Sequence, residues 1–181
     1  MDPARNLNCF NRRIMAQALL RVLADTDMLA MKTQTVWWSL QGSALAFLDK
    51  ALEGQRQDLL DSMTPLARRV RALSSDIVID HATLNAHARI VASQPKGTSE
   101  CEALRQLPLD HQKIAEVIRC ARALAATLDD NTTLSLLELR LVAHEAAVSQ
   151  LEDFFSGLDE RHDLLGQQAN ECLVPGLEVP A

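Results

Sequence analysis

The stretch LADTDMLAMKTQTVWWSLQG, residues 23–42, ends the first of four long helical patterns in the chain. Its apolar residues continue a stripe with a period near 3.6 residues, formed by Ile14, Leu19, Val22, Leu23, Leu29 and Trp37. Asn11 is a candidate N-cap, because an Asn side chain accepts hydrogen bonds from the free N–H groups of a first helical turn. The pattern therefore predicts a helix from about Asn11 to Ser39, with Gly42 closing the connection that follows.

A second helical pattern follows from the N-cap candidate Ser43 to Leu73. Its stripe consists of Leu45, Leu48, Leu52, Leu59, Met63, Leu66, Val70 and Leu73. Pro65 lies inside this pattern and lacks the N–H that would bond to the carbonyl of Asp61. Because the stripe resumes in register on both sides of Pro65, the pattern predicts a kink there and not a stop.

The rest of the chain predicts two more long helices after a mixed central segment, residues 74–108. A short helix is expected at Asp80–Leu84, and loop chemistry at Ser93–Ser99. The third long helix is predicted to start near Pro108–Asp110, and the fourth to run from about Leu134 to Phe155. A connection of this length lets the second and third helices run parallel. The predicted fold class is all-α: an antiparallel four-helix bundle with a long crossover that carries a short helix between helices 2 and 3.

The expected organisation is one bundle domain over residues 11–157, an N-terminal arm over residues 1–10 and a C-terminal tail over residues 158–181. The tail is expected to be weakly ordered, with room for one short helix around residues 159–170. A length of 181 residues with 48% hydrophobic residues suits a single packed core. Neither a signal-peptide pattern nor a run long enough to span a bilayer is recognised, and the four Cys form no CxxC pair. These features predict a cytoplasmic protein that does not enter a membrane.

Two stretches of the chain resemble the Dps proteins, which are small ferritin-like cages associated with starvation and oxidative stress. The run Leu23–Thr26 followed by Lys32–Gly42 resembles a first-helix signature of approximately LADT, a spacer and KTHNFHWNVxG. The run Leu139–Ala147, LRLVAHEAA, resembles a fourth-helix run like RLxxHEKA. The resemblance covers about residues 11–155. It implies a ferritin-like bundle, a homo-dodecamer with the short helix near Asp80–Leu84 at a two-fold interface, and iron as the bound metal.

The resemblance also places an inter-subunit ferroxidase site, and most of its positions have changed here. One subunit of the family supplies a His, a second His and an acid, and the partner supplies an Asp and a Glu; the matching positions are Trp37, Asp49, Glu53, Thr64 and Arg68. An indole offers only a donor N–H, and a guanidinium is permanently positive. Asp49 and Glu53 remain as a weak remnant of a metal site. We therefore predict that Arg68 pairs with these two acids across the subunit interface in place of iron.

Three functions follow from these observations. The first is a Dps-like cage protein of the iron-binding, stress-protection type whose ferroxidase site is degenerate, with no catalytic residue assigned. The second is a working ferroxidase that uses Asp49 and Glu53 with water. The third is a binding module that holds a small ligand near Trp37 and Trp38. The first is favoured, which makes an enzymatic role the less expected one.

Other residues suggest weaker assignments. Asp129 and Asp130 match acids that line iron-entry pores in the family, and a helix-cap role fits them equally well. His144 is interpreted as a hydrogen-bonded histidine packed within its helix. The arm over residues 1–13 has a net charge of +2 without Lys, and the tail from Asp159 has a net charge of −4. DNA binding is therefore expected to be weak or absent. Assembly with an intact paralogue stays open as an alternative to a homo-oligomer.

Overall fold

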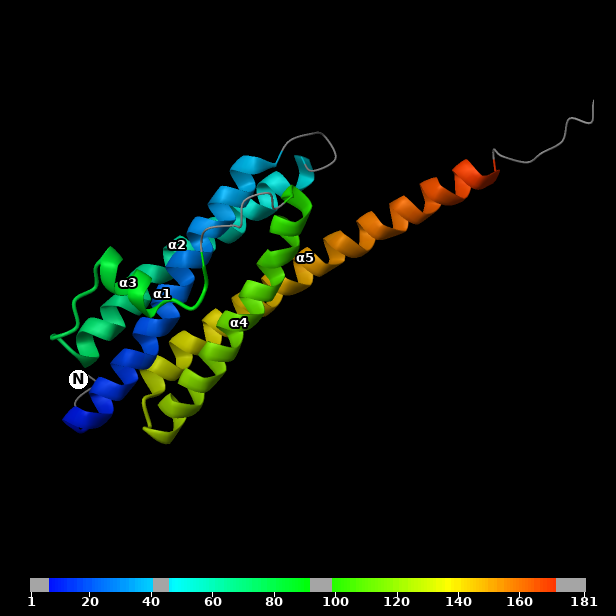
Figure 1. Ribbon diagram of the computed structural model, residues 1–181. Helices are drawn as coiled ribbons and strands as arrows, with labels where there is room; N and C mark the ends of the chain where they lie inside the picture. The colour runs from blue at the N-terminus through cyan, green and yellow to red at the C-terminus, as the bar shows by residue number, and fades with distance from the viewer. Residues whose placement is uncertain (1–6, 41–45, 92–98, 172–181) are drawn as a thin grey trace, which may run out of the picture.

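Four long helices and one short helix make up the described part of the computed structural model (Figure 1). They are α1 (Cys9–Ser39), α2 (Ala46–Leu73), α3 (His81–His87), α4 (Glu100–Thr127) and α5 (Asn131–Glu171). The structure describes residues 7–40, 46–91 and 99–171, and from residue 158 onward it describes the backbone alone. The predicted all-α class is confirmed for these residues.

The four long helices form the predicted antiparallel bundle. In Figure 1, α1 and α5 run in one direction and α2 and α4 in the other, and the crossover that joins α2 to α4 carries α3, which lies against α1. The closest packing is between α1 and α2 and between α4 and α5, while α1 also contacts α4 and α3. Contacts between α2 and α5 are sparse. The bundle is therefore two helical hairpins joined mainly through α1 and α4.

Two predicted helix starts were wrong, and a capping side chain explains each. Asn8, with a ψ of 160°, caps α1 by accepting the N–H of Asn11 at 2.8 Å, so Asn11 lies inside the first turn. Ser99 caps α4 and forms a reciprocal pair with Glu102, which starts that helix well before Pro108. The Ser-x-x-Glu spacing is a capping-box signature in the sequence. Pro108 lies inside α4, where the helix continues to bury its apolar stripe on both sides.

The other boundaries agree with the predictions in part. Helix α2 continues through Pro65, whereas Ser43 and the loop residues 93–98 lie outside the described residues. Asp80 caps α3 by accepting the N–H of Thr83 at 2.7 Å. Helix α5 does not end near Phe155 but continues to Glu171, and its C-terminal part leaves the bundle in Figure 1. Gly157 lowers helix propensity without ending the helix, and the next proline is Pro175.

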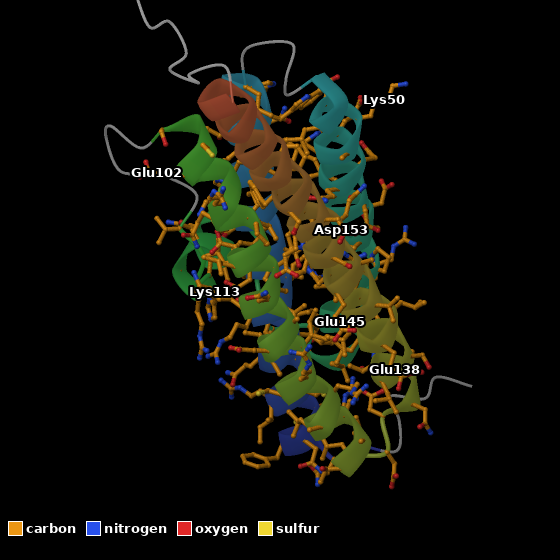
Figure 2. All side chains as sticks on the ribbon, turned by 90° about the vertical axis from the view of Figure 1, so that its right-hand side faces the viewer. Lys50, Glu102, Lys113, Glu138, Glu145 and Asp153 are labelled. Carbon is orange, nitrogen blue, oxygen red and sulfur yellow. The ribbon has the colours of Figure 1, made fainter. Side chains whose placement is uncertain are left out.

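The core is an apolar layer between the four long helices. Its largest fully buried side chains come from every one of them: Met15, Leu19, Leu23, Leu29, Leu52, Leu59, Leu66, Leu104, Leu107, Ile114, Ile118 and Leu137. Charged side chains such as Lys50, Glu138 and Asp153 lie on the outside of the helices (Figure 2). Within the described residues no helix combines the length and the apolar character that a membrane span requires.

Two buried ion pairs connect the helices: Lys32 with Asp110, and Arg69 of α2 with Asp130 in the turn before α5. Lys32 of α1 donates to Asp110 of α4 at 2.5 Å, and Lys113 and Gln106 also donate to Asp110. Burial opposes the charged form of Asp110, but these three donors outweigh it and hold its pKa below the ordinary value. Lys32 belongs to the sequence run that resembles the Dps signature, and its role here is to hold α1 against α4.

Candidate functional site

The five positions matched to the ferroxidase ligands lie near the end of α1 and along α2. The structure brings two of them together, because Nε1 of Trp37 donates to Oδ1 of Asp49 at 2.5 Å. The guanidinium of Arg56 lies over the same indole, 5.8 Å from the ring centroid. Trp37 is half-buried against the core, whereas Asp49 is exposed. One oxygen of Asp49 is therefore already occupied by a donor of its own chain.

The remaining three positions are exposed and spread along α2. Glu53 lies one helical turn after Asp49, as its spacing predicted. Arg68 lies 19 residues after Asp49, which is about 28 Å along a helix with a rise of 1.5 Å per residue. Within one chain the two side chains cannot meet. Arg68 has no ion pair with the described residues of its own chain. Thr64 is also exposed, one turn before Arg68.

The described part of the chain contains no group of three His, Cys, Asp or Glu side chains close enough to hold a metal ion. A site shared between subunits would draw on two chains, so this finding concerns sites within one subunit. The family arrangement that the sequence suggested depends on such a shared site. The ligand roles of Asp49 and Glu53 accordingly stay predictions.

The two pore candidates occupy the turn between α4 and α5. Asp129 has a φ of 55°, the left-handed region that Asp tolerates better than most residues. Asp130 is buried, accepts Nη2 of Arg69 at 2.6 Å, and caps α5 by accepting the N–H of Thr133. Burial opposes its charged form, but the bonds from Arg69 and Thr133 prevail and lower its pKa. Asp130 therefore has a structural role as a helix cap, and the pore role of both acids stays a prediction.

A buried pair of histidines lies between α4 and α5. Nδ1 of His111 and Nδ1 of His144 are 2.9 Å apart, and the two side chains are 2% and 1% exposed. Burial disfavours the imidazolium form, and the nearby charge of Arg140 adds to this, so the pKa of His111 falls to about 4. Burial, His111 and Arg140 hold the pKa of His144 well below its ordinary value. Both rings are therefore neutral at pH 7.

His144 is hydrogen-bonded and packed in the bundle, as its place in the sequence predicted, whereas His111 was not among the predicted residues. A signal for His111 was present. Leu107, His111, Ile114 and Ile118 follow one another at helical spacing, so His111 takes a position in the apolar stripe of α4. A histidine in a buried stripe needs a partner, and no other part of the sequence identifies which one.

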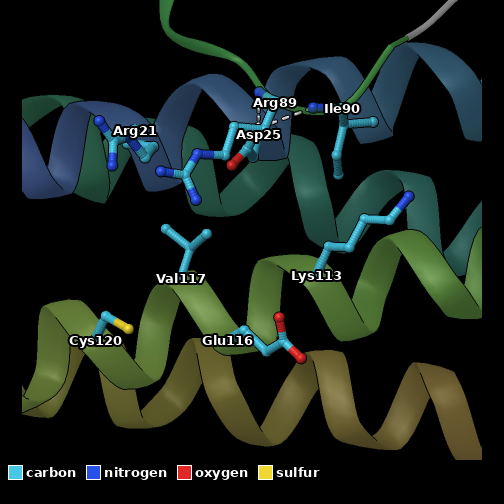
Figure 3. A pocket seen from close by; sticks show the side chains of 8 residues that line it. All are labelled: Arg21, Asp25, Arg89, Ile90, Lys113, Glu116, Val117 and Cys120. Carbon is cyan, nitrogen blue, oxygen red and sulfur yellow. Dashed lines mark hydrogen bonds between the residues drawn. The ribbon is translucent and has the colours of Figure 1, made fainter.

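A pocket of about 320 Å³ lies between α1, α4 and the part of the crossover that directly follows α3 (Figure 3). Oδ1 of Asp25 accepts the backbone N–H groups of Arg89 and Ile90 there, at 2.5 and 3.2 Å. Asp25 belongs to the LADT run, so this residue fixes the crossover against α1. Neither Trp37 nor Trp38 lines this pocket, and Trp38 is 74% exposed.

Comparison with known proteins identifies the fold. No protein-family model matches the chain, and neither does any curated protein. Among solved structures, the Dps protein of Vibrio cholerae, a member of a broad superfamily of ferritin-like diiron-carboxylate proteins, is 21% identical with a TM-score of 0.74, over 82% of this chain and 93% of that one. DpsC from Streptomyces coelicolor is 23% identical with a TM-score of 0.74, over 96% and 91%. A dodecameric thioferritin from Bacteroides fragilis is 14% identical with a TM-score of 0.78, over 90% and 94%. The chain thus has the ferritin-like four-helix bundle fold of the Dps proteins.

Proposed function

We propose that this chain is a subunit of a Dps-like cage whose inter-subunit ferroxidase position no longer binds iron. The observation that carries the proposal is the hydrogen bond from Trp37 to Asp49. Both residues stand at positions matched to His ligands of the family. The indole of Trp37 cannot bind a metal, and it occupies one oxygen of the Asp49 carboxylate. The fold supports the cage, because the chain is similar to Dps proteins and to a thioferritin that is dodecameric.

In this proposal a protein cation replaces the charge of the metal. Arg68 cannot reach Asp49 of its own chain, since about 28 Å of helix separates them. Arg68 of the partner subunit would face Asp49 and Glu53 across a two-fold interface near α3. A guanidinium matches carboxylates in a forked geometry and needs no metal to balance their charge. The interface would then be an ion-paired contact that stabilises the dimer.

The wider function proposed is that of a cytoplasmic cage subunit in iron homeostasis and stress protection, either as a homo-dodecamer or together with an intact paralogue. Iron would be bound at surfaces other than the inter-subunit position. DNA binding is expected to be weak or absent, because phosphate contacts need clustered positive charge and the chain has a net charge of −6. A gel-shift with excess protein is expected to leave plasmid unretarded at about 150 mM salt, and retardation at that salt, where weak phosphate contacts are screened, would contradict this expectation.

The first experiment measures assembly and metal content in the same sample. Size-exclusion chromatography with light scattering is expected to give a mass near twelve subunits. Metal analysis of that peak is expected to find less than one iron ion per subunit interface. A monomer would contradict the cage.

The second experiment measures iron oxidation in the wild type and in two variants. The wild type is expected to oxidise Fe²⁺ no faster than buffer. The variant Asp49→Ala/Glu53→Ala serves as the control and should behave like the wild type. The variant Trp37→His/Thr64→Asp/Arg68→Glu restores one imidazole and two carboxylates, which are ligands that suit ferrous iron. It is expected to gain iron-oxidation activity. A saturable wild-type activity that the control variant abolishes would favour the alternative of a working ferroxidase.

A further inference from the structure

The short helix α3 lies against α1 and is held there by few contacts (Figure 1). Of its seven residues only Leu84 is buried. Asp80 caps its first turn, and Asp25 of α1 accepts the backbone N–H groups of Arg89 and Ile90 just after it. A helix of this length does not persist alone in water, because its first turn costs more than the few following bonds return. The attachment of α3 to α1 is therefore sensitive to a single contact that is gained or lost.

Asp27 of α1 presents a buried, unpaired oxygen to this helix. The residue is 9% exposed, and its Oδ2 has no hydrogen-bond partner in the described part of the chain. Nδ1 of His81, the first residue of α3, lies 3.7 Å from that oxygen. This separation is too long for a hydrogen bond and short enough for electrostatic attraction. Burial raises the pKa of Asp27, and the charge of His81 opposes this rise. His81 is thus placed to supply the donor that the buried oxygen lacks.

The other titratable groups of this region have partners of their own. Asp80 precedes His81, and its carboxylate accepts the N–H of Thr83, which lowers the pKa of Asp80. His87 lies at the far end of α3, where its Nδ1 is 2.8 Å from the carbonyl oxygen of Thr83. Helix α3 contains no Lys or Arg. The side chain of His81 is 73% exposed, so it exchanges protons with water. His81 is therefore the residue of α3 whose charge changes beside Asp27.

We propose that Asp27 and His81 form a pH-sensitive latch that holds α3 against α1. When His81 is protonated, both ring nitrogens carry a proton, and a small rotation of the exposed ring lets Nδ1–H donate to Oδ2 of Asp27 in a charge-assisted hydrogen bond. An imidazole gains its second proton near pH 6.5, so the latch closes as the pH falls through that value. The latch opens again at lower pH, where Asp27 takes up a proton and loses its charge. Helix α3 is therefore held most firmly in a window of mildly acidic pH. The latch lies within one chain and does not depend on the proposed cage.

Hydrogen–deuterium exchange of the full-length protein tests the latch, because the backbone N–H groups of α3 exchange when the helix leaves α1. After correction for the intrinsic effect of pH on exchange, the protection of α3 is expected to be about threefold higher at about pH 5.5 than at about pH 7.5, the size of effect of an ion pair with one exposed member. The buried pair of His111 and His144 acts in the opposite direction, because its low pKa values favour unfolding at acid pH. A gain of protection on acidification therefore cannot come from that pair. Protection that is equal at the two pH values, or lower at the acid one, would overturn the proposal.

Matched variants identify the group that titrates. His81→Gln keeps a polar side chain that cannot be charged, and its α3 is expected to exchange at both pH values as the wild type does at about pH 7.5. Asp27→Asn removes the charge of the acceptor with little change of shape, and it should lose the pH dependence as well. His87→Gln makes the first change at the other histidine of α3 and should keep the pH dependence. A pH dependence that survives in His81→Gln or in Asp27→Asn would overturn the assignment, and so would one that is lost in His87→Gln alone.

Discussion

Two buried polar clusters connect α5 to the rest of the bundle, and they differ in how completely their atoms are paired. In the first, Arg69 donates to both Asp130 and Thr133, and Thr133 donates to Asp130 through its N–H and its hydroxyl. In the second, His111 and His144 pair through Nδ1 and leave both Nε2 atoms without partners in the described residues.

The difference separates a network that stabilises the bundle from one that costs stability. A fully paired network stabilises one arrangement of the helices, because any change leaves a buried charge uncompensated. A half-paired network costs free energy, because a buried polar atom without a partner loses its hydrogen bonds to water and gains none in the protein. We therefore expect a break in the first cluster to cost much more stability than the replacement of both histidines of the second. Three predictions test this contrast, and a fourth concerns the contact between Trp37 and Asp49.

The largest effect is expected from Asp130→Ala. The change leaves the guanidinium of Arg69 buried without its counter-charge and removes the cap of α5, so the free energy of unfolding should fall by about 3–5 kcal/mol. Urea denaturation followed by circular dichroism measures it. Arg119→Ala is the control, because Arg119 and Glu145 form an exposed pair at 2.7 Å whose loss costs about 1 kcal/mol or less. Equal losses in the two variants would remove the distinction between the clusters.

The histidine cluster predicts a loss of stability at acid pH. The pKa of His111 is near 6.5 in the unfolded chain and about 4 in the folded one, so the unfolded state binds more protons between these values. Its contribution is therefore complete above about pH 6.5 and declines as the pH falls toward 4, by an amount on the order of 3 kcal/mol at 1.36 kcal/mol per pKa unit. Urea denaturation at intervals from pH 7 to pH 4 measures this slope.

The next prediction concerns the double variant His111→Leu/His144→Leu, which is also the control for the pH dependence of the free energy of unfolding. Replacing both partners of a buried polar pair by apolar side chains is often close to neutral, so the free energy of unfolding at pH 7 should stay within about 1 kcal/mol of the wild type. The single variant His111→Leu leaves His144 without its partner and should lose about 1–3 kcal/mol. The slope between pH 6.5 and pH 4 should become smaller in the double variant. An unchanged slope would show that other groups cause the acid sensitivity.

The sequence predicted the features that local chemistry decides. The apolar stripes placed the four long helices, and the register around Pro65 correctly indicated that α2 continues. The starts of α1 and α4 were missed because Asn8 and Ser99 compete with equally plausible caps nearby. The end of α5 was missed because a glycine by itself does not end a helix.

The site depends on tertiary contacts that a sequence pattern does not contain. Asp25 reaches the crossover 64 residues later, and His111 pairs with a residue 33 positions away. The indole of Trp37 predicted a position without a metal ligand, and its bond to Asp49 follows from how the ends of α1 and α2 pack. Residue types therefore predicted which positions lack a metal-binding side chain, and only the packing showed which side chains these positions contact.

A small effect on stability is expected from Trp37→Phe. The bond from the indole to Asp49 lies where Asp49 is exposed, so water replaces much of it, and the free energy of unfolding should fall by about 0.5–1 kcal/mol. Trp38→Phe is the matched control at the neighbouring, exposed indole and should change stability by less than about 0.5 kcal/mol. Denaturation of both variants under the same conditions makes the comparison. A loss as large as that of Asp130→Ala would show that Trp37 is part of the structural framework. A small loss would show that the residue at this position can change with little effect on the bundle, which is what the proposed replacement of a metal ligand by tryptophan requires.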